Sequence, residues 1–214
     1  MDAIVKPAGV AALLIFLAFL MHSINALYIE PQILGFEDPR VDYAKVEKLQ
    51  NAMGSIPWML SGFGHIISGF AAVILGFAGH ALFVDARPLA GRLALAAGAI
   101  AGAGFLLTGI AGVMGGQALR LLAAQNADQI NAIYLAGSVM RVSFNGLAIV
   151  AMGWFAVVLS WCGLKTGRLP KGFSYFGFLA GISGLMLAVI FIPFYLQLYL
   201  IWSLWLGILL LRMP

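Results

Sequence analysis

Charged residues and cysteine are both scarce in this 214-residue chain. Only 9% of its residues are charged and 63% are hydrophobic, whereas a soluble domain is typically about 25% charged and about 45–50% apolar. Such a chain cannot hide its apolar surface in one water-soluble core, so we expect lipid to surround it. The single cysteine, Cys162, excludes an internal disulfide and any paired-cysteine metal or redox site.

The charges that do occur leave five long uncharged runs, at residues 7–29, 49–84, 93–119, 142–164 and 172–211. A spanning helix needs about 20 apolar residues. The last run would be about 60 Å long as one helix, twice the hydrocarbon thickness, and Pro193 predicts a break within it. We therefore expect an all-α, polytopic bundle in one domain over residues 1–214, with six spans at about 8–28, 57–83, 90–117, 136–163, 173–192 and 195–212.

The first run follows Lys6, as the apolar part of a signal peptide would. It is longer than the roughly 7–15 apolar residues of such a segment. We therefore interpret it as the first transmembrane helix.

Lysine and arginine predict the orientation, because cytoplasmic loops are enriched in both. With the N-terminus inside, seven cations face the cytoplasm and four lie outside, and the loop GLKTGRLPKGF carries three cations without an acid. This bias predicts N-in and C-in in a bacterial cytoplasmic (inner) membrane. Because the cations stand in short loops beside apolar runs, the net charge of +4 indicates a membrane protein and no nucleic-acid partner.

One sizeable polar loop, residues 29–56, is expected outside the membrane. Asp38 followed by Pro39 is typical of a helix start. Val46, Leu49 and Met53 then share one face of a short amphipathic helix. We expect this helix to lie as a lid on the bundle or on the membrane surface.

Glycine is abundant, with 26 residues, and it suits helix packing in lipid, where small residues let backbones approach closely. Three pairs stand four residues apart: Gly98 and Gly102, Gly112 and Gly116, and Gly177 and Gly181. We expect the third helix, which is richest in small residues, at the centre of the bundle. The glycine faces could also pack against other membrane subunits.

Acidic residues are absent from all six expected spans. Ion-coupled transport usually needs a buried carboxylate, and hydrolysis or metal binding needs acids that are missing here. Ser61 and Ser68 flank His65, but no acid is at hand to orient the imidazole. We expect no catalytic residue and no metal ligand, and the balance favours a protein that is not an enzyme.

Histidine supplies the most specific possibility. His22 lies about 9 Å, and His65 about 12 Å, below the outer ends of their spans. Antiparallel neighbours would therefore place the two imidazoles at one depth, as ligation of a b-type haem requires. In this hypothesis Arg141 stands near the haem propionates. The alternative is that both histidines are structural, as we expect for His80 at the cytoplasmic end.

Arg141 and Asn145 are four residues apart and share a helix face. They could line an outward-facing polar pocket and bind a ligand. They could equally form hydrogen bonds between helices, or Arg141 could extend to the headgroups.

The C-terminal part resembles a group of small bacterial six-helix membrane proteins of unknown function. The resemblance rests on IYLAGSVMRVSFNGLAIV, on the basic loop and Gly-rich helix of LKTGRLPKGFSYFGFLAGISGLM, and on the ending LIWSLWLGILLLR. It implies a six-span inner-membrane protein and carries no activity.

Three functions therefore remain open. The favoured one is a non-enzymatic membrane protein, either an accessory subunit of a larger complex or a binder of a small apolar molecule. The second is an electron carrier with haem b between His22 and His65. The third is a channel or facilitator for a neutral solute, which requires a continuous polar path that only scattered Ser, Asn and Gln residues could line.

Overall fold

The computed structural model describes residues 2–190 and 194–213, and every element in this part of the chain is helical. The elements are α1 (Asp2–Ile24), η1 (Asn25–Ile33), α2 (Pro39–Asp42), α3 (Val46–Ala52), α4 (Ile56–Phe83), α5 (Pro88–Ile110), η2 (Ala111–Gly115), α6 (Gly116–Gln125), η3 (Ala127–Gln129), α7 (Ile130–Thr166), α8 (Lys171–Met186) and α9 (Tyr195–Arg212). The expected all-α class is confirmed.

Five helical stretches are long and apolar enough to cross a membrane: Ile4–Ile33, Ile56–Phe83, Pro88–Gln125, Ala127–Thr166 and Tyr195–Arg212. The expected fifth span corresponds to α8, which has 16 residues and ends at Met186. Pro193, to which the break was attributed, lies outside the described residues.

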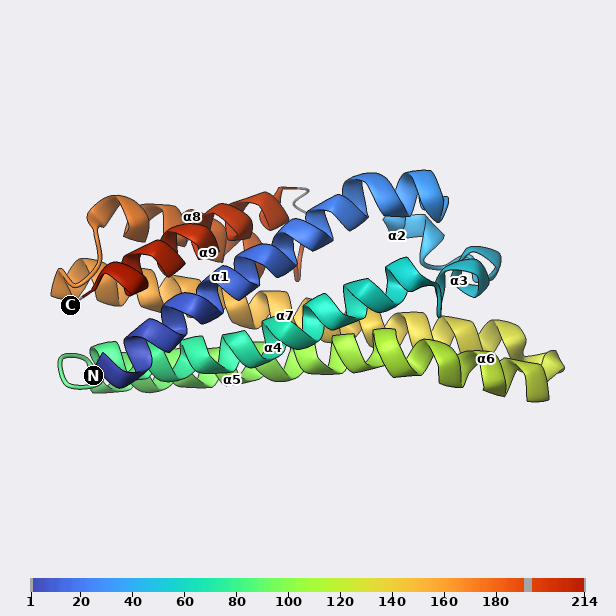
Figure 1. The fold of residues 1–214 in the computed structure, drawn as a ribbon, viewed down its shortest axis with the longest axis horizontal. Coiled ribbons are helices and arrows are strands. Elements are labelled where there is room, and N and C mark those ends of the chain that lie inside the picture. Colours follow the sequence, from blue (N-terminus) through green and yellow to red (C-terminus); the bar gives the residue numbers. More distant parts are fainter. Residues whose placement is uncertain (1, 191–193, 214) are drawn as a thin grey trace.

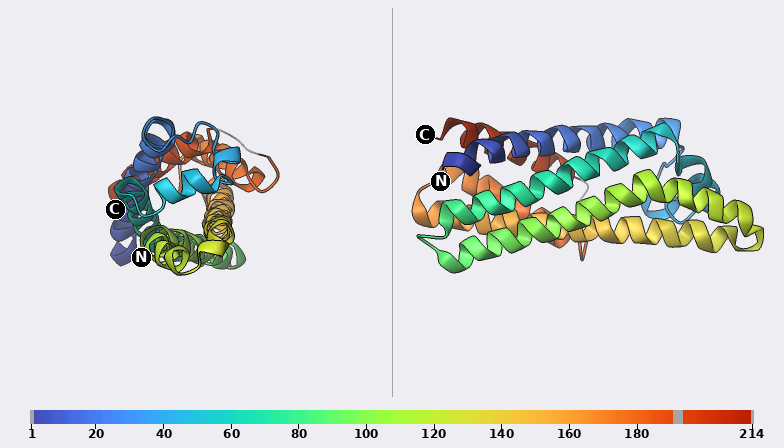
Figure 2. Two further views of the ribbon diagram at one scale, coloured as in Figure 1. Left: turned by 90° about the vertical axis from the view of Figure 1, so that its right-hand side faces the viewer. Right: turned by 60° about the horizontal axis from the view of Figure 1, so that its bottom comes forward.

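The six long helices form a closed ring in the order α1, α4, α5, α7, α8 and α9, and α9 packs back against α1 (Figure 2). The expectation that the third helix is central is wrong, because α5 lies in the ring between α4 and α7. The ring closes at the end where α1 begins and α9 ends, which we call the basic end because most of the lysines and arginines lie there. At this end Lys6 Nζ donates hydrogen bonds of 2.7 Å to the carbonyls of Leu211 and Met213. The start of α1 and the end of α9 therefore lie side by side (Figure 1).

The stretches Pro88–Gln125 and Ala127–Thr166 have 38 and 40 residues, or about 57 and 60 Å of helix. This is roughly twice the hydrocarbon thickness. Their hairpin therefore projects past the end of the ring opposite Lys6, where α3 packs beside it (Figure 1). We call this the outer end, after the orientation expected from the sequence. We call residues 34–55, which contain α2 and α3, the lid.

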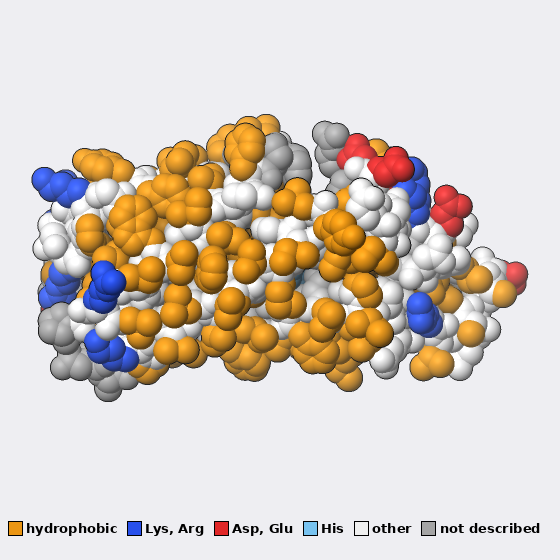
Figure 3. All heavy atoms as spheres, turned by 45° about the horizontal axis from the view of Figure 1, so that its top comes forward, with side chains coloured by type: hydrophobic (Ala, Val, Ile, Leu, Met, Phe, Trp, Pro, Cys, Tyr) orange, Lys and Arg blue, Asp and Glu red, His pale blue; other side chains and the backbone are white. Residues whose placement is uncertain are grey.

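Apolar side chains cover the middle of the surface, and charged side chains collect at its two ends (Figure 3). Seven lysine and arginine residues stand at the end formed by the α4–α5 and α7–α8 loops, whereas most acids stand at the lid end, together with Lys45, Lys48 and Arg120. Exposed apolar residues such as Phe70, Leu107 and Ile201 lie on the outer faces of the helices. This pattern is what a lipid-embedded bundle requires, because lipid rather than water solvates these side chains.

Glycine brings the backbones of α4 and α5 into contact. A Cβ placed on Gly98 would lie 2.5 Å from the Cα of Gly76, and one on Gly102 would lie 2.8 Å from the carbonyl oxygen of Gly69. Gly153 and Gly181 face each other in the same way between α7 and α8. The glycine pairs singled out in the sequence therefore serve packing within this chain.

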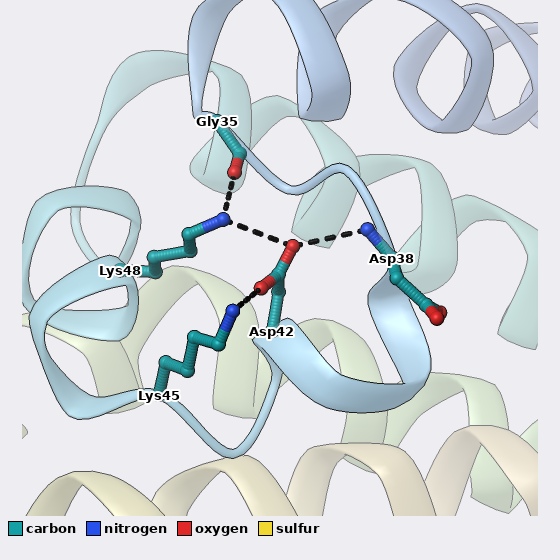
Figure 4. A network of polar contacts seen from close by, with 5 residues as sticks. All are labelled: Gly35, Asp38, Asp42, Lys45 and Lys48. Carbon is teal, nitrogen blue, oxygen red and sulfur yellow. Dashed lines mark hydrogen bonds and ion pairs between the residues drawn. The ribbon is translucent and has the colours of Figure 1, made fainter.

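The lid is held to the outer end by apolar and ionic contacts. Leu49, Ala52 and Met53 are buried against Tyr134 of α7. The carboxylate of Asp42, only 1% exposed, lies 2.7 Å from Lys45 Nζ and 3.0 Å from Lys48 Nζ, and it accepts a 3.0 Å hydrogen bond from the backbone N–H of Asp38 (Figure 4). Lys48 also donates to the Gly35 carbonyl. These contacts, that with Lys45 above all, hold the pKa of Asp42 well below its usual range.

The α4–α5 contact predicts that Gly98→Ala destabilises the fold. The new methyl group would push against backbone atoms of α4, and overpacking of this kind costs about 1–3 kcal/mol. Gly146→Ala is the matched control, because no described atom lies within 4 Å of its added Cβ. That change should be neutral or slightly stabilising through the better helix propensity of alanine. Unfolding in detergent measures both, and equal stability of the two variants would contradict the assigned packing.

The Asp42 contacts predict that the lid loosens in acid. A carboxyl whose folded-state pKa is lowered stabilises the fold above its unfolded pKa of about 3.9, and this stability is lost as the pH falls towards the folded value. Hydrogen-exchange protection of residues 35–55 should therefore decrease as the pH falls below about 4. Asp42→Asn should lower this protection already at pH 7 and flatten its pH dependence. Asp128→Asn, an exposed acid on the projecting hairpin, should behave like the wild type; a lid equally protected in all three proteins at pH 7 would rule out the ionic role.

Candidate small-molecule site

The imidazoles of His22 and His65 meet near the outer end of the ring, between α1 and α4. Their ring centroids are 4.0 Å apart, with the planes tilted by 45°. His22 is 16 residues beyond Lys6 and His65 is 19 residues before Val84, which places them about 24 and 28 Å from the basic end. The prediction that the two histidines lie at one depth is confirmed, and this depth is close to the outer limit of a hydrocarbon layer of about 30 Å.

This pair of rings does not fit a haem. A metal ion held by two imidazoles needs about 2.0–2.1 Å to each nitrogen, so opposed ligands stand about 4 Å apart at their nitrogens and farther apart at their centroids. Here the centroids themselves are 4.0 Å apart, and the rings touch. His65 also directs Nδ1 at the Ser61 carbonyl, at 2.7 Å, and Nε2 at Asn145 Oδ1, at 3.3 Å. The haem hypothesis for His22, His65 and Arg141 therefore disagrees with the side-chain positions.

Arg141 of α7 contacts α4 close to the two histidines. It is only 8% exposed. Its Nη2 donates a 3.1 Å hydrogen bond to Ser61 Oγ, and its Cζ lies 3.6 Å from the centroid of the Trp58 ring. Trp58 is fixed at the start of α4, where Ser55 Oγ accepts a hydrogen bond from its backbone N–H. The expectation that Arg141 extends to the headgroups is wrong, because the guanidinium packs inside the bundle.

Ser61 links the residues from the two helices. Its carbonyl accepts the hydrogen bond from His65, and its hydroxyl accepts the one from Arg141. Asn145 lies one turn of α7 beyond Arg141 and contacts the other nitrogen of His65. The sequence-predicted residues His22, His65, Arg141 and Asn145 are therefore brought together. With Ser61 they form what we call the outer polar cluster.

Glu30 lies beside the outer polar cluster and was missed by sequence reasoning. The expected first span ended at residue 28, but the helical stretch continues through the π-helical η1 to Ile33 and carries Glu30 in its last part. Pro31 cannot donate a backbone hydrogen bond, which favours a local departure from α-helix. The apolar Ile33 and Leu34 beyond Glu30 were the signal that the helix goes on.

The Glu30 carboxylate connects η1 to the lid. Its Oε1 accepts hydrogen bonds from Asn25 Nδ2, at 2.6 Å, and from the Tyr43 hydroxyl, at 2.9 Å. Ser138 of α7 in turn donates to the Tyr43 carbonyl, at 2.8 Å. Burial of the Tyr43 phenol raises its pKa above the usual range, so the hydroxyl stays a hydrogen-bond donor. Tyr43 thereby joins the lid to η1 and to α7.

Two nitrogens in the outer polar cluster have no hydrogen-bond partner within the described part of the chain: His22 Nε2 and Arg141 Nη1. We call them the two unpaired nitrogens. Both are buried, since His22 and Arg141 are only 9% and 8% exposed. Buried polar groups normally have a partner, and leaving one without is costly. An arrangement of this kind is suited to hold a hydrogen-bond acceptor supplied from elsewhere.

Nucleophilic catalysis has little support from these positions. His65 contacts the carbonyl of Ser61, whereas the Ser61 hydroxyl accepts its hydrogen bond from Arg141, so His65 is not placed to take the hydroxyl proton. Cys162 is buried in the apolar core towards the basic end. Among the described residues, no three His, Cys, Asp or Glu side chains come together in a way that could hold a metal ion.

Comparisons with protein-family models, with curated proteins and with solved structures return no match. The resemblance of the C-terminal part to small six-helix membrane proteins stays a prediction. Any assignment of function must therefore come from the outer polar cluster itself.

Proposed function

We propose that the chain is a six-span protein of the bacterial inner membrane with both termini in the cytoplasm. The contact of Lys6 with the end of α9 supports placing both termini on one side. Such a placement requires an even number of crossings, so α8 would be the sixth. It has about 24 Å of helix and packs between α7 and α9. The gathering of cations at the end formed by the α4–α5 and α7–α8 loops supports the cytoplasmic assignment of that end.

We further propose that the protein binds a small molecule in the outer polar cluster and does not transform it. The observation that carries this proposal is the pair of unpaired nitrogens, on a charged and a neutral side chain that two different helices bring together. Intramembrane ionisable residues are costly and commonly mark binding sites or pathways. Bacterial membranes offer many molecules that combine an apolar body with one polar group, and a site at the outer limit of the hydrocarbon suits such a ligand.

The other candidate functions have less support. Glycines that could have met a partner subunit are used within the ring. A polar path for a solute would have to pass the inner half of the bundle, where Leu75, Phe155, Leu159 and Leu206 surround a cavity of only about 10 Å³. The haem carrier disagrees with the contact between His22 and His65.

The proposed topology predicts the labelling of two matched cysteine variants. In a Cys162→Ala background, Ala127→Cys on the outer hairpin should react with a membrane-impermeant maleimide in intact cells. Ala86→Cys between α4 and α5 should react only after the cells are opened; both positions are exposed. A fluorescent protein fused after residue 214 should fluoresce in the cytoplasm. A periplasmic C-terminus would leave α8 outside the membrane and refute six spans.

The proposed binding function predicts a ligand retained through purification. Native mass spectrometry of protein extracted in mild detergent should show a small-molecule adduct in the wild type. Arg141→Gln and His22→Gln should each lose most of it, since each removes one of the two unpaired nitrogens from its place in the site. Arg120→Gln is the control, because Arg120 is an exposed arginine of α6. The visible spectrum of the same sample should lack a haem Soret band. An adduct equally abundant in all four proteins would place binding elsewhere.

A further inference from the structure

We infer that the ligand of the outer polar cluster is a singly charged oxyanion, a carboxylate or a phosphodiester, whose oxygens accept hydrogen bonds from the two unpaired nitrogens. The inference rests on the proposed binding function and adds the chemical class of the ligand. It also distinguishes the site from one for a neutral carbonyl or hydroxyl compound.

The positive charge of Arg141 is the first reason. A guanidinium stays protonated in proteins, and within the described part of the chain no carboxylate lies within ion-pair distance of it. Its contacts with the Trp58 ring and with Ser61 Oγ stabilise the charge in part. They leave Nη1 buried without an acceptor. A buried charge without a counter-ion is strongly unfavourable, and only an anion supplies both the missing acceptor and the missing charge.

Glu30 does not supply this counter-ion directly. Its Oε1 is held by Asn25 and Tyr43, on the lid side of the outer polar cluster. It is near enough to interact electrostatically with Arg141 but makes no contact with the guanidinium among the described residues. Glu30 should therefore weaken the binding of an anion by repulsion, so that a singly charged ligand is favoured over one with two charges.

Glycines, which have no side chain, stand beside both groups that carry the two unpaired nitrogens. His22 packs beside Gly64, where a Cβ would come within 3.3 Å of the imidazole, and the Nε of Arg141 lies 3.9 Å from a Cβ placed on Gly112. These glycines keep side chains away from both groups. Gly146, one residue beyond Asn145, has no described atom within 4 Å of an added Cβ and is partly exposed on α7.

The depth of the site fits two sources of the anion. At about 24–28 Å from the basic end, the outer polar cluster lies near the outer hydrocarbon boundary. The head of a fatty acid or of an anionic lipid in the outer leaflet could reach it from the lipid side. A small water-soluble anion could reach it from outside when the lid opens. The chemistry of recognition is the same for both sources.

The test compares charged and neutral probes on delipidated protein in detergent. Oleate is paired with oleyl alcohol, phosphatidylglycerol with phosphatidylcholine, and acetate with acetamide. We expect at least one anion to raise the melting temperature of the wild type while its neutral partner does not. Stabilisation by oleate or phosphatidylglycerol indicates a membrane ligand, and stabilisation by acetate alone indicates a free anion. Either result supports the inference.

Four variants test the residues, with the dissociation constant of the stabilising anion as the readout. Arg141→Gln should weaken binding at least about tenfold, whereas Arg141→Lys, which keeps the charge without the planar fork, should fall between it and the wild type. Glu30→Gln should tighten binding severalfold, because it removes a repelling charge. Arg120→Gln should match the wild type. The opposite sign for Glu30→Gln would mean that Glu30 serves the site structurally and would overturn the electrostatic reasoning.

The outcomes separate this inference from the proposed function. If neutral partners stabilise the wild type as well as the anions do, and Arg141→Gln still loses its retained ligand, the oxyanion inference is wrong and the binding function stands. If no probe stabilises the wild type and native mass spectrometry shows no adduct, both are wrong. If Arg141→Gln does not fold, the Arg141→Lys and Glu30→Gln affinities still decide the question.

Discussion

Hydrocarbon offers no hydrogen bonds, and the arrangement of this bundle follows from that constraint. Each polar side chain that lies within a spanning stretch must find its partner inside the protein or at the boundary. The inner half has a largely apolar core, in which even Cys162 is packed among alanine, leucine and aromatic side chains, although Ser160 and Ser174 are buried there as well. The outer half meets it by gathering Ser61, His65, Arg141 and Asn145 into one network. The ionisable His22, His65 and Arg141 are thus gathered at one place, where function is to be sought.

Close helix packing makes this concentration possible. The backbones of α4 and α5 touch where Gly62 and Gly69 of α4 meet Gly109 and Gly102 of α5. This contact holds α4 in its place in the ring, between α5 and α1. Ser61 and His65 stand on the same stretch of α4, so the glycine contacts also fix where these two side chains point. In lipid, where apolar surface alone gives helices no preference for one another, such close contacts determine which helices become neighbours.

Composition was sufficient to predict helices in lipid, and helix rise was sufficient to place His22 and His65 at one depth. Both predictions depend on quantities that act along one helix. The failures all concern relations between helices or departures from regular geometry. The haem hypothesis rested mainly on matched depth, and depth does not tell whether two rings touch or stand apart. Glu30 was assigned to a loop because a charge was taken to end the span, although a π-helical turn lets the chain carry that carboxylate into a protected position. We expected α5 at the centre because it is rich in small residues. In a ring, however, small residues allow close packing against two neighbouring helices just as well.

The lid is bonded to Glu30, which lies beside the outer polar cluster, and this bears on how a ligand would enter and leave. Tyr43 belongs to the lid, yet its hydroxyl is bonded to Glu30 and its carbonyl to Ser138 of α7. Opening the lid must break both bonds, which removes one of the two donors that hold the Glu30 carboxylate. A carboxylate that loses a donor becomes a stronger centre of negative potential beside Arg141. Opening would then weaken the hold of the site on an anion, whereas closure, which restores the Tyr43 bond, would strengthen it. Under the proposed function, the ligand would enter and leave while the lid is open and would be retained while the lid is closed. Neither step would require the tightly packed inner half to move.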